Sequence, residues 1–458
     1  MPTQSIESIL KWIAWSQQTQ STLVKKVPLS QMHNWALSDD GYRISHASGK
    51  FFSIEGISVY LNGTVWDQAI VRQPEYGILG MLVTEDAGEV FLLIQAKVEP
   101  GNVNWVQLSP TLQATQSNYN QVHKGRRPHY LDFFLHPYER YVLYDGLQSE
   151  QGSRFLKKRN RNMIVYIEDI ENVPIMDNFL WVSFYNLKQL CAVDNLVNMD
   201  TRSVISCITP DIMYEIYSMR YRSVKISGKH KVRDTDKTSF FSDAAVLTKL
   251  TEAKVKTLLE FRHKPLSKLV DWDLDDNQLS HTKHKYFRVI GVRISVGSRE
   301  VSQWDQPMLE PANQGLCALF VKYIDDVLHC VAQVISECGV FDTAEFGPSI
   351  QCLDEDYRNA SDDRYPLLSY ALDRPRSEVL YDVLFSEEGG RFFQDQNRYM
   401  VIKCKDNTCF HLPENYVWLS FDQVYRMILY SNVFNIQFRS LLSLIPFPTK
   451  CDPESSCS

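Results

Sequence analysis

The sequence predicts an α+β fold made by tandem duplication of two homologous domains. The first observation is a repeated segment, in which residues 142–163 (VLYDGLQSEQGSRFLKKRNRNM) share 13 of 22 positions with residues 379–400 (VLYDVLFSEEGGRFFQDQNRYM). The second is a mixture of short runs rich in Ile, Val, Phe and Tyr with segments of helical periodicity. The spacing of 237 residues between the copies is too long for a solenoid unit and indicates two domains.

The spacing also predicts where the two domains begin and end. We expect the first repeat to cover residues 1–210, with an N-terminal helix followed by a core at 32–210. Residues 211–241 end in a basic, polar stretch without apolar periodicity and are predicted to form a linker. The second repeat is then expected to cover residues 242–447.

Each repeat is expected to open and close with a helix. Residues 5–18 carry apolar side chains at helical spacing, and residues 242–264 show a comparable pattern. Amphipathic helices are predicted to close the repeats at 179–195 and 416–432. Between these helices, Ile-, Val- and Phe-rich runs predict strands of a mixed or antiparallel sheet, for example at 51–61, 77–85 and 88–99.

Composition excludes several classes of protein. A formal net charge of −7 with 44% hydrophobic and 22% charged residues is typical of a globular domain and argues against a general nucleic-acid binder. No apolar run reaches the roughly 18 residues of a membrane span, and no signal peptide is evident. The ten cysteines form no CxxC pair, so we expect no metal site, reduced core cysteines and a cytoplasmic location. Rossmann, P-loop, HExxH and GxSxG motifs are absent.

The duplicated segment itself is the first candidate functional motif. Glu150 and Arg154 flank a glycine, as Glu387 and Arg391 do in the second copy. A glycine at such a turn lets backbone approach a ligand between a carboxylate and a guanidinium. The alternative interpretation is a buried ion pair that holds the turn and is needed only for folding.

A second candidate lies at residues 97–119, where hydrogen-bonding side chains are crowded together. If 108–119 is a strand, alternation places Thr111, Gln113, Thr115 and Ser117 on one face. That face is either solvated or lines a polar pocket. Pro, Gln and Tyr recur at matching positions of the second repeat, which favours the pocket.

Two basic segments form a third candidate, HKGRRPHY at 123–130 and KKRNRN at 157–162. Arginine offers bidentate hydrogen bonds to a diphosphate, although charge runs are usually solvated loops. The second copy is poorer in basic residues and places three carboxylates at 354–356, where the first has Gln, Ser and Asn. Because carboxylates repel a diphosphate, we expect the second copy to be the one that has lost its ligand.

With EPGN, LSPTLQATQSNY, LQSEQGSRF, KRNRN, VNMDTRS and SEEGGRF in view, the chain resembles the nucleotide-diphosphohexose 2,3-dehydratases of deoxysugar biosynthesis. The resemblance covers roughly residues 32–210 and 265–446. It implies two Nudix-like α+β domains, a homodimer, and a dTDP-linked 4-keto-6-deoxyhexose substrate with one catalytic pocket and one relic. The Arg-Glu of a Nudix hydrolase box is replaced by Val383-Leu384, which argues against metal-dependent hydrolysis.

This chemistry removes the C3 proton, which is α to the C4 carbonyl, and expels the C2 hydroxyl, without a cofactor. It needs a base, an acid and donors to the C4 oxyanion. We predict Glu150 or His123 as acid or base and Tyr119 as proton donor or oxyanion ligand, with Trp66 or Trp105 stacked on the base of the nucleotide. The predicted substrate-binding residues are Trp66, Glu99, Asn102, Thr111, Gln113, Thr115, Ser117, Asn118, Arg126, Arg154, Arg159, Asn160 and Arg161. The residues expected in the second-repeat pocket are Trp304, Gln351, Tyr357, Glu387, Arg391, Asn397 and Arg398.

The expected partners follow from the same chemistry. A 3,4-diketo-2,6-dideoxy product is unstable and calls for a downstream 3-ketoreductase, whereas neither nucleic acid nor membrane is expected as a partner. Two other functions stay open from the residues alone. One is a non-catalytic sugar-nucleotide-binding or scaffold protein, and the other is a Nudix-type nucleotide-sugar hydrolase.

Overall fold

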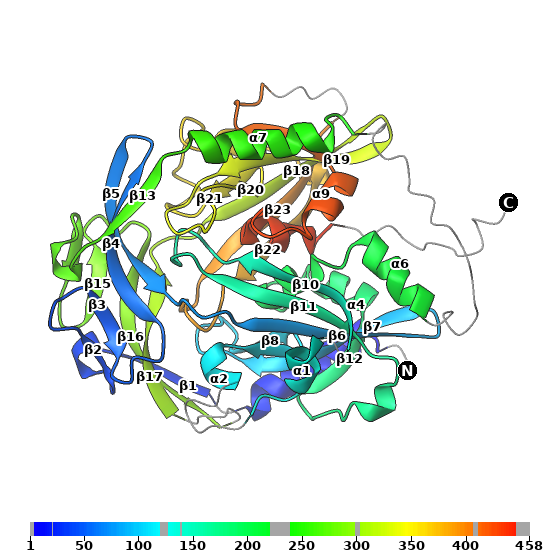
Figure 1. The fold of residues 1–458 in the computed structure, drawn as a ribbon, viewed down its shortest axis with the longest axis horizontal. Helices are drawn as coiled ribbons and strands as arrows, with labels where there is room; N and C mark the ends of the chain where they lie inside the picture. The colour runs from blue at the N-terminus through cyan, green and yellow to red at the C-terminus, as the bar shows by residue number, and fades with distance from the viewer. Residues whose placement is uncertain are drawn as a thin grey trace.

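The computed structural model describes residues 4–20, 22–119, 127–137, 140–219, 239–297, 303–405 and 411–445. Sheets dominate the fold, and comparatively few, mostly short helices cover them (Figure 1). Two large sheets and two small sheets share the strands. The fold is therefore a mixed α+β architecture with two repeated halves, as the sequence predicts.

The first half contains the helices α1 (Ile6–Thr19), α2 (Gln116–Tyr119), α3 (Asp132–Leu135), α4 (Phe184–Leu190), α5 (Met199–Ile205) and α6 (Pro210–Met219). Its strands are β1 (Thr22–Val27), β2 (Trp35–Leu37), β3 (Arg43–His46), β4 (Ser53–Leu61), β5 (Thr64–Arg72), β6 (Ile78–Asp86), β7 (Glu89–Val98), β8 (Val106–Ser109), β9 (Leu112–Ala114), β10 (Tyr141–Ser149), β11 (Arg159–Tyr166) and β12 (Phe179–Ser183).

The second half contains the helices α7 (Asp243–Lys256), α8 (Leu368–Leu372), α9 (Phe421–Met427) and α10 (Ile436–Leu442). Its strands are β13 (Leu259–His263), β14 (Trp272–Leu274), β15 (Gln278–His281), β16 (Phe287–Val296), β17 (Gln303–Pro311), β18 (Leu316–Ile324), β19 (Val327–Ile335), β20 (Glu345–Gly347), β21 (Ile350–Cys352), β22 (Val379–Ser386), β23 (Gln396–Lys403) and β24 (Tyr416–Ser420).

The two large sheets have the same topology. In the first half the strand order is β10-β11-β6-β7-β12, with β8 added to β7 and β9 to β6. In the second half it is β22-β23-β18-β19-β24, with β20 on β19 and β21 on β18. The β11–β6 and β18–β23 pairs are parallel and the other pairs antiparallel. The duplicated segment therefore forms the same edge hairpin twice, β10–β11 and β22–β23.

The small sheets are built by exchange of one strand between the halves (Figure 1). Strand β1 of the first half pairs antiparallel with β16 of the second, from Thr22 opposite Val296 to Val27 opposite Gly291. Strand β13 of the second half pairs in the same way with β4 of the first. Edge strands present unpaired backbone groups to any compatible neighbour, and here each half supplies the edge strand of the other.

Two aspartates hold the exchanged segments. The Asp67 carboxylate accepts hydrogen bonds from the Lys264 ammonium and from the Val270 N–H at 2.7 Å. Its counterpart Asp305 accepts the His33 N–H at 2.7 Å. These bonds, together with the hydrogen bonds from the Arg293 guanidinium to Asp305, keep the pKa of both carboxyl groups below the usual value, although burial alone would raise it. The two halves therefore cannot separate without breaking sheet pairs and buried hydrogen bonds.

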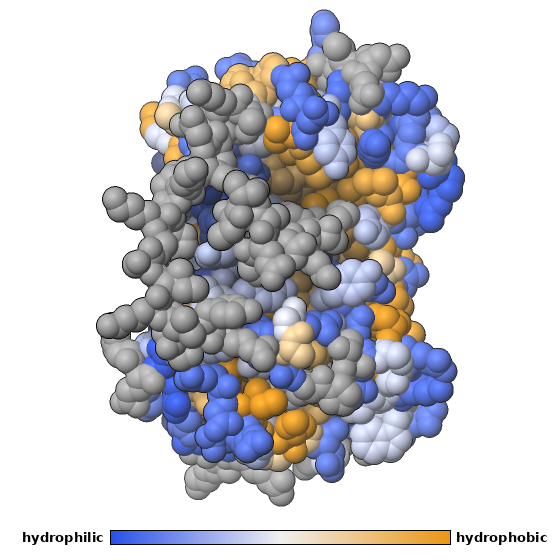
Figure 2. Space-filling model, turned by 90° about the vertical axis from the view of Figure 1, so that its right-hand side faces the viewer, coloured by the Kyte–Doolittle hydropathy of each residue, from blue (hydrophilic) through white to orange (hydrophobic). Residues whose placement is uncertain are grey.

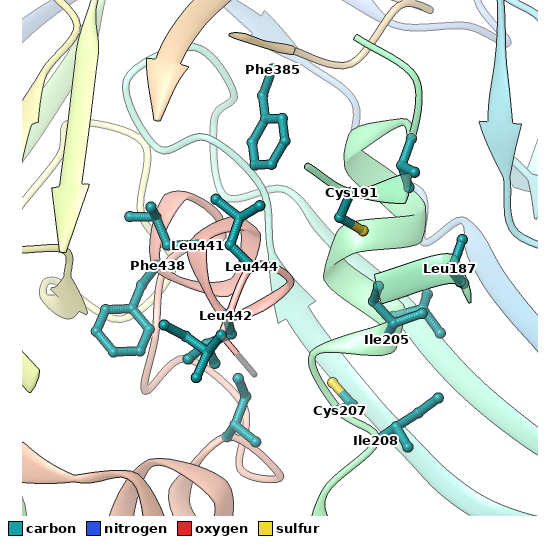
Figure 3. Packing of buried hydrophobic residues seen from close by; sticks show 14 of the residues in the cluster. Leu187, Cys191, Ile205, Cys207, Ile208, Phe385, Phe438, Leu441, Leu442 and Leu444 are labelled. Atoms are coloured by element: carbon teal, nitrogen blue, oxygen red, sulfur yellow. The ribbon is translucent and has the colours of Figure 1, made fainter. Parts of the chain in front are cut away.

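One hydrophobic core continues from the first half into the second. It includes the inner faces of both large sheets and the facing helices α5 and α10. Figure 3 shows Leu187, Cys191 and Ile205 on the green helices of the first half, facing Leu441 and Leu444 of the second. A separate core joins the two small sheets and holds Phe155 and Phe392, whose rings meet edge to face at 5.6 Å.

Several predicted elements are confirmed. The helix expected at 5–18 is α1, capped by the Ser5 hydroxyl, which accepts the Ser8 N–H. The runs at 51–61, 77–85 and 88–99 contain β4, β6 and β7. The described cysteines are all free and buried: Cys191, Cys207, Cys317, Cys330, Cys338, Cys352 and Cys404.

Other element predictions are wrong in their bounds. The helix predicted at 242–264 ends at Lys256, because residues 259–263 gain backbone partners by pairing with β4. The helix predicted at 179–195 is β12 followed by α4, with the Ser183 hydroxyl capping the helix. The same division into β24 and α9 occurs in the second half. In all three places tertiary pairing outweighs the helical spacing of the apolar residues.

The predicted strand at 108–119 is also corrected. Only β8 and β9 are extended, and α2 follows at Gln116. Residues 211–219 of the predicted linker belong to helix α6, whose Ile212, Met213 and Ile216 are buried. Residues 220–238 of that linker lie outside the described residues.

None of the described helices is long and apolar enough to cross a membrane. On the face shown in Figure 2, hydrophobic residues lie among hydrophilic ones in the upper part of the molecule, along its right-hand edge and in a smaller patch near the bottom.

Gly101 lies where the halves approach most closely, and its replacement tests the shared core. A Cβ atom at this position would lie 1.7 Å from the Phe392 carbonyl oxygen, which belongs to the other half. Because that neighbour is backbone, it cannot move aside, and we expect Gly101→Ala to lower the free energy of unfolding by about 3 kcal/mol. Reversible urea denaturation measures this change.

Gly49→Ala is the matched control, because its Cβ would contact nothing within 4 Å although the backbone φ of +65° is strained. That strain costs about 1 kcal/mol. Equal losses in the two variants would show that the contact between the halves adds nothing at Gly101.

Candidate functional site

The main cavity has a volume of about 610 Å³ and is lined by residues of both halves. The first half contributes the ends of β6, β7, β9 and β11 and the turn between β10 and β11. The second half contributes Trp304 and Gln306 of β17 and the turn residues Glu388 and Arg391. Pockets of about 300–1,000 Å³ are typical of small-molecule sites, so this cavity is the candidate site.

Five residues with carboxyl groups line the cavity: Glu99, Glu150, Asp200, Asp305 and Glu388. Burial raises the pKa of Glu150, raises that of Asp200 well above its usual value, and raises that of Glu388 to about 7. One carboxyl oxygen of each of these three is buried without a hydrogen-bond partner among the described residues. Buried polar atoms are normally paired, so these oxygens are the strongest indication of a ligand.

Glu150 is held in a fixed orientation by the adjacent strand. Its Oε1 accepts a hydrogen bond from Asn160 Nδ2 at 2.7 Å, and Asn160 Oδ1 accepts the Gly77 N–H at 3.1 Å. The Glu150 N–H donates to the Lys158 carbonyl at 3.1 Å. The unpartnered oxygen, Oε2, therefore belongs to a residue that is held by hydrogen bonds through both its side chain and its backbone.

Glu99 belongs to a second hydrogen-bonded group in the cavity. Its Oε1 accepts from Gln113 Nε2 at 2.8 Å and from the Lys97 ammonium at 3.4 Å. Gln113 Oε1 in turn accepts from Asn198 Nδ2 at 3.1 Å. Asn198 also caps helix α5, which carries Asp200, so this group ties the cavity floor to that helix.

Four Lys and Arg residues line the cavity, Lys97, Lys158, Arg293 and Arg391, of which Arg293 is paired with Asp305 at 2.8 Å. Arg391 comes from the second half, and its guanidinium lies 4.1 Å from the centre of the Phe52 ring and donates to Gln73 Oε1 at 3.3 Å. The Lys158 ammonium donates to the Glu75 carbonyl. Among the described residues, no group of three or more His, Cys, Asp or Glu side chains is arranged to hold a metal ion.

Six of the residues predicted for the first-repeat site line this cavity. They are Glu99, Gln113, Thr115, Asn118, Glu150 and Asn160. They come from three separate segments of the chain, and the fold brings them together around the Glu150 carboxyl group.

Arg154 and Trp66 do not line the main cavity. The turns and the small sheets reach from one half into the other, so the counterparts of these residues from the second half line it instead. Arg154 lines the second cavity and stacks on Phe287 of the second half at 4.7 Å. Its counterpart Arg391 enters the main cavity instead. Likewise Trp66 packs against residues of the exchanged strand β13, whereas its counterpart Trp304 lines the main cavity.

Five other predicted residues have partners elsewhere in the structure. The Thr111 hydroxyl donates to the Leu93 carbonyl, Asn102 packs beside Gly389, and Arg161 pairs with Asp145 at 2.5 Å. Arg159 stacks on Phe341 at 3.5 Å, and Tyr119 is half-buried beside a hydrophobic cluster, where burial raises its pKa. None of these five side chains is part of the cavity lining. His123, Arg126 and the side chain of Ser117 lie outside what the structure describes.

The second cavity is much smaller, about 20 Å³, and the predicted residues that line it are Arg154, Glu387 and Asn397. Gln351 Nε2 donates to Glu337 at 3.0 Å, and the Arg398 guanidinium donates to the Tyr357 hydroxyl at 3.4 Å. Trp304 and Arg391, which were expected here, lie in the main cavity.

Known proteins resemble this chain along both repeats. The family model described as NDP-hexose 2,3-dehydratase matches residues 6–208 and again 243–445. The chain belongs to the NDP-hexose 2,3-dehydratase family. The two matches start 237 residues apart, the spacing of the duplicated segment.

Three curated relatives of this family member carry the same printed name, dTDP-4-dehydro-6-deoxy-alpha-D-glucopyranose 2,3-dehydratase. The one from Saccharopolyspora spinosa is 39% identical over 443 residues, covering 94% of this chain and 89% of the relative. The one from Streptomyces violaceoruber is 39% identical over 441 residues, covering 95% of each. The one from Amycolatopsis orientalis is 33% identical over 448 residues, covering 96% of this chain and 90% of the relative.

The cavity residues of this family member that were not among the predicted site residues include four charged ones that differ between the copies: Lys97, Lys158, Asp200 and Glu388. Their counterparts in the second copy are Ile335, Asp395, Gln437 and Gln151. At each of the four positions, the charged side chain in the cavity is matched in the other copy by a neutral or oppositely charged one. Comparing the copies for charge differences, rather than for shared residues, is the signal that could have found them.

The second cavity predicts how stability depends on pH. Burial and the neighbouring Glu387 carboxylate raise the pKa of Asp395 from 3.8 to about 7. Between these values the folded chain holds a proton that the unfolded chain has released, so the free energy of unfolding falls as pH rises. We expect Asp395→Asn to remove about 1.4 kcal/mol per pH unit of that slope. Urea denaturation at several pH values between 4 and 8 measures it, and parallel curves for the two proteins would contradict the expectation.

Proposed function

We propose that this family member removes water across C2 and C3 of a dTDP-linked 4-keto-6-deoxyhexose, giving a 3,4-diketo-2,6-dideoxy sugar. The observation that carries the proposal is the group of three carboxyls with unpartnered buried oxygens in one cavity. Elimination next to a carbonyl needs groups that accept and donate protons near neutral pH. The printed names of the relatives support the substrate.

In the proposed reaction, Glu150 takes the proton from C3. Its Oε2 has no partner among the described residues, and its other oxygen is held by Asn160. Glu388 then gives a proton to the departing C2 hydroxyl, because its raised pKa of about 7 keeps part of it protonated at neutral pH. The acid therefore comes from the second half of the chain and the base from the first.

The remaining residues of the cavity bind the nucleotide sugar. We assign the diphosphate to Arg391, because arginine binds phosphate oxygens in a bidentate manner. We assign the thymine ring to Trp304, whose indole N–H donates to Gln306 at 2.9 Å and so fixes the ring. Thr115 and Asn118 lie where hydroxyl and amide groups can bind the sugar hydroxyls.

Further parts of the proposal are less directly tied to the cavity. Each half is a Nudix-like domain, since both contain a mixed sheet of the same topology and the SEEGG segment resembles the end of a Nudix box. We place the protein in the cytoplasm because its cysteines are typical of reduced core residues, and the family resemblance implies a homodimer. A 3-ketoreductase consumes the unstable diketo product.

The alternatives are a hydrolase and a non-catalytic binding protein. In the SEEGG turn, Glu387 lines the second cavity and Glu388 lines the main one. Two neighbouring carboxylates that point into different cavities do not form one shared site, which disfavours Nudix hydrolysis. A cavity lined by buried acids with raised pKa values likewise favours catalysis over binding alone.

Mass spectrometry of the purified protein with dTDP-4-keto-6-deoxyglucose separates these functions. A 3-ketoreductase in excess and its reduced cofactor are included to trap the product. Loss of water, followed by reduction, is the expected result. Release of dTMP would identify a hydrolase, and binding without any change of mass would identify a binding protein.

A further inference from the structure

The two duplicated turns have the same pattern of hydrogen bonds. In the first, the Glu150 N–H donates to the Lys158 carbonyl at 3.1 Å, and in the second the Glu387 N–H donates to the Asp395 carbonyl at 3.0 Å. Asn160 donates to Glu150 at 2.7 Å, as Asn397 donates to Glu387 at 2.9 Å. Both cavities therefore have the same glutamate, the same asparagine and the same hydrogen bonds between them. These shared features cannot by themselves explain why the cavities differ.

The residue whose carbonyl accepts the glutamate N–H differs between the two turns. Lys158 lines the cavity of about 610 Å³, whereas Asp395 lines the cavity of about 20 Å³. Lys158 is only 6% exposed, and burying an ammonium costs free energy unless partners offset it. One of its three N–H groups donates to the Glu75 carbonyl. Such a buried charge beside Glu150 is expected where a negative charge develops.

We propose that Lys158 is a catalytic residue whose ammonium donates a hydrogen bond to the C4 oxygen and stabilises the enolate. This inference rests on the proposed function and deepens it. When Glu150 takes the C3 proton, the C3–H electron pair forms the C3=C4 double bond and C4–O becomes the oxyanion. The oxyanion then re-forms C4=O, C2=C3 forms, and the C2–O bond breaks. The hydroxide leaves as water with the proton of Glu388, and the enol at C3 tautomerises to the ketone.

The surroundings of Lys158 make this role dependent on pH. Burial lowers its pKa to about 8, although the carboxylates of Glu150, Glu75 and Glu388 favour the charged form and Arg391 opposes it. The ammonium is therefore lost as pH rises through about 8, which adds a fall in kcat/KM near pH 8 to the one expected near pH 7 from loss of the Glu388 proton. Arginine stays charged at that pH, so Lys158→Arg should not show a fall that is centred there.

Steady-state turnover of dTDP-4-keto-6-deoxyglucose, with 3-ketoreductase in excess, tests the role of Lys158. Lys158→Met is expected to lower kcat by about 100-fold or more, the usual effect of losing one oxyanion donor, with KM changed only a few-fold. Exchange of the C3 hydrogen in deuterated water should fall in parallel, because enolate formation is the impaired step. Asp395→Asn, the matched change in the other cavity, should keep wild-type turnover at pH 7.5.

Each result has a defined meaning. A kcat for Lys158→Met within 3-fold of wild type, or a KM that rises as much as kcat falls, would overturn the inference. If Lys158→Met does not fold, Lys158→Arg decides through its pH profile, and a fall still centred near pH 8 overturns the inference. A wild-type protein that produces no water loss refutes the proposed function instead, so the two failures are distinguishable.

Discussion

Glu150→Gln is expected to lower kcat by about 10²- to 10⁴-fold, the usual contribution of a positioned general base. The amide keeps the shape of the side chain and can still bond Asn160, whose Nδ2 lies 2.7 Å from Oε1. It cannot accept the C3 proton. Turnover measured with the 3-ketoreductase assay, and dTDP affinity measured by calorimetry, separate loss of chemistry from loss of binding.

Glu387→Gln is the matched variant in the second copy. Glu387 has the same asparagine partner, at 2.9 Å, but lines the small cavity. We expect its turnover to stay within a few-fold of wild type. The opposite pattern, an active Glu150→Gln and an inactive Glu387→Gln, would assign the reaction to the second copy.

Replacing either of the two fully buried arginines is expected to give the largest loss of stability. Arg202 on α5 is 0% exposed; it donates to the Ser386 carbonyl of the other half at 2.8 Å and lies over the Phe385 ring at 4.1 Å. Arg439 on α10 donates in the same way to the Ser149 carbonyl of the first half. Arg202→Met or Arg439→Met leaves buried carbonyls unpaired, and we expect each to lower the free energy of unfolding by about 3–5 kcal/mol.

Both variants should also lower kcat when each is measured below its unfolding midpoint. Arg439 holds the turn that carries the proposed base Glu150, and Arg202 holds the turn that carries the proposed acid Glu388. Urea denaturation of both single variants and the double variant gives the coupling between them. Losses below about 0.5 kcal/mol, the range of ordinary surface substitutions, would contradict a structural role for these arginines.

The sequence alone predicted the parts of the fold that depend on local pattern. The repeated segment revealed the duplication, and alternating or continuous apolar runs located β4, β6 and β7. Residues shared by the two copies led to Glu150, Asn160, Glu99 and Gln113, which the structure brings into one cavity. The fold predictions succeed because each depends on residues close together in the chain or matched in both copies.

Local pattern could not assign the strand at 259–263, which has apolar residues spaced as in the helix before it. Nor could it place Arg154, because a turn residue that is retained in both copies gives no sign of which cavity it enters. The physical reason is the same in both cases. Two homologous halves offer chemically similar partners, and only the three-dimensional packing decides which half a strand or side chain joins.

The sequence by itself therefore determined that the chain is a duplicated α+β protein of the sugar-nucleotide dehydratase type, and it singled out Glu150 as a candidate site residue. Only the tertiary structure decided that β1 and β13 are exchanged and that Arg391, Trp304 and Glu388 of the second half complete the cavity of the first. Backbone groups at a sheet edge pair with whichever compatible strand is nearest. The exchange links the two halves in their small sheets, while the crossing turns carry Glu388 and Arg391 toward Glu150.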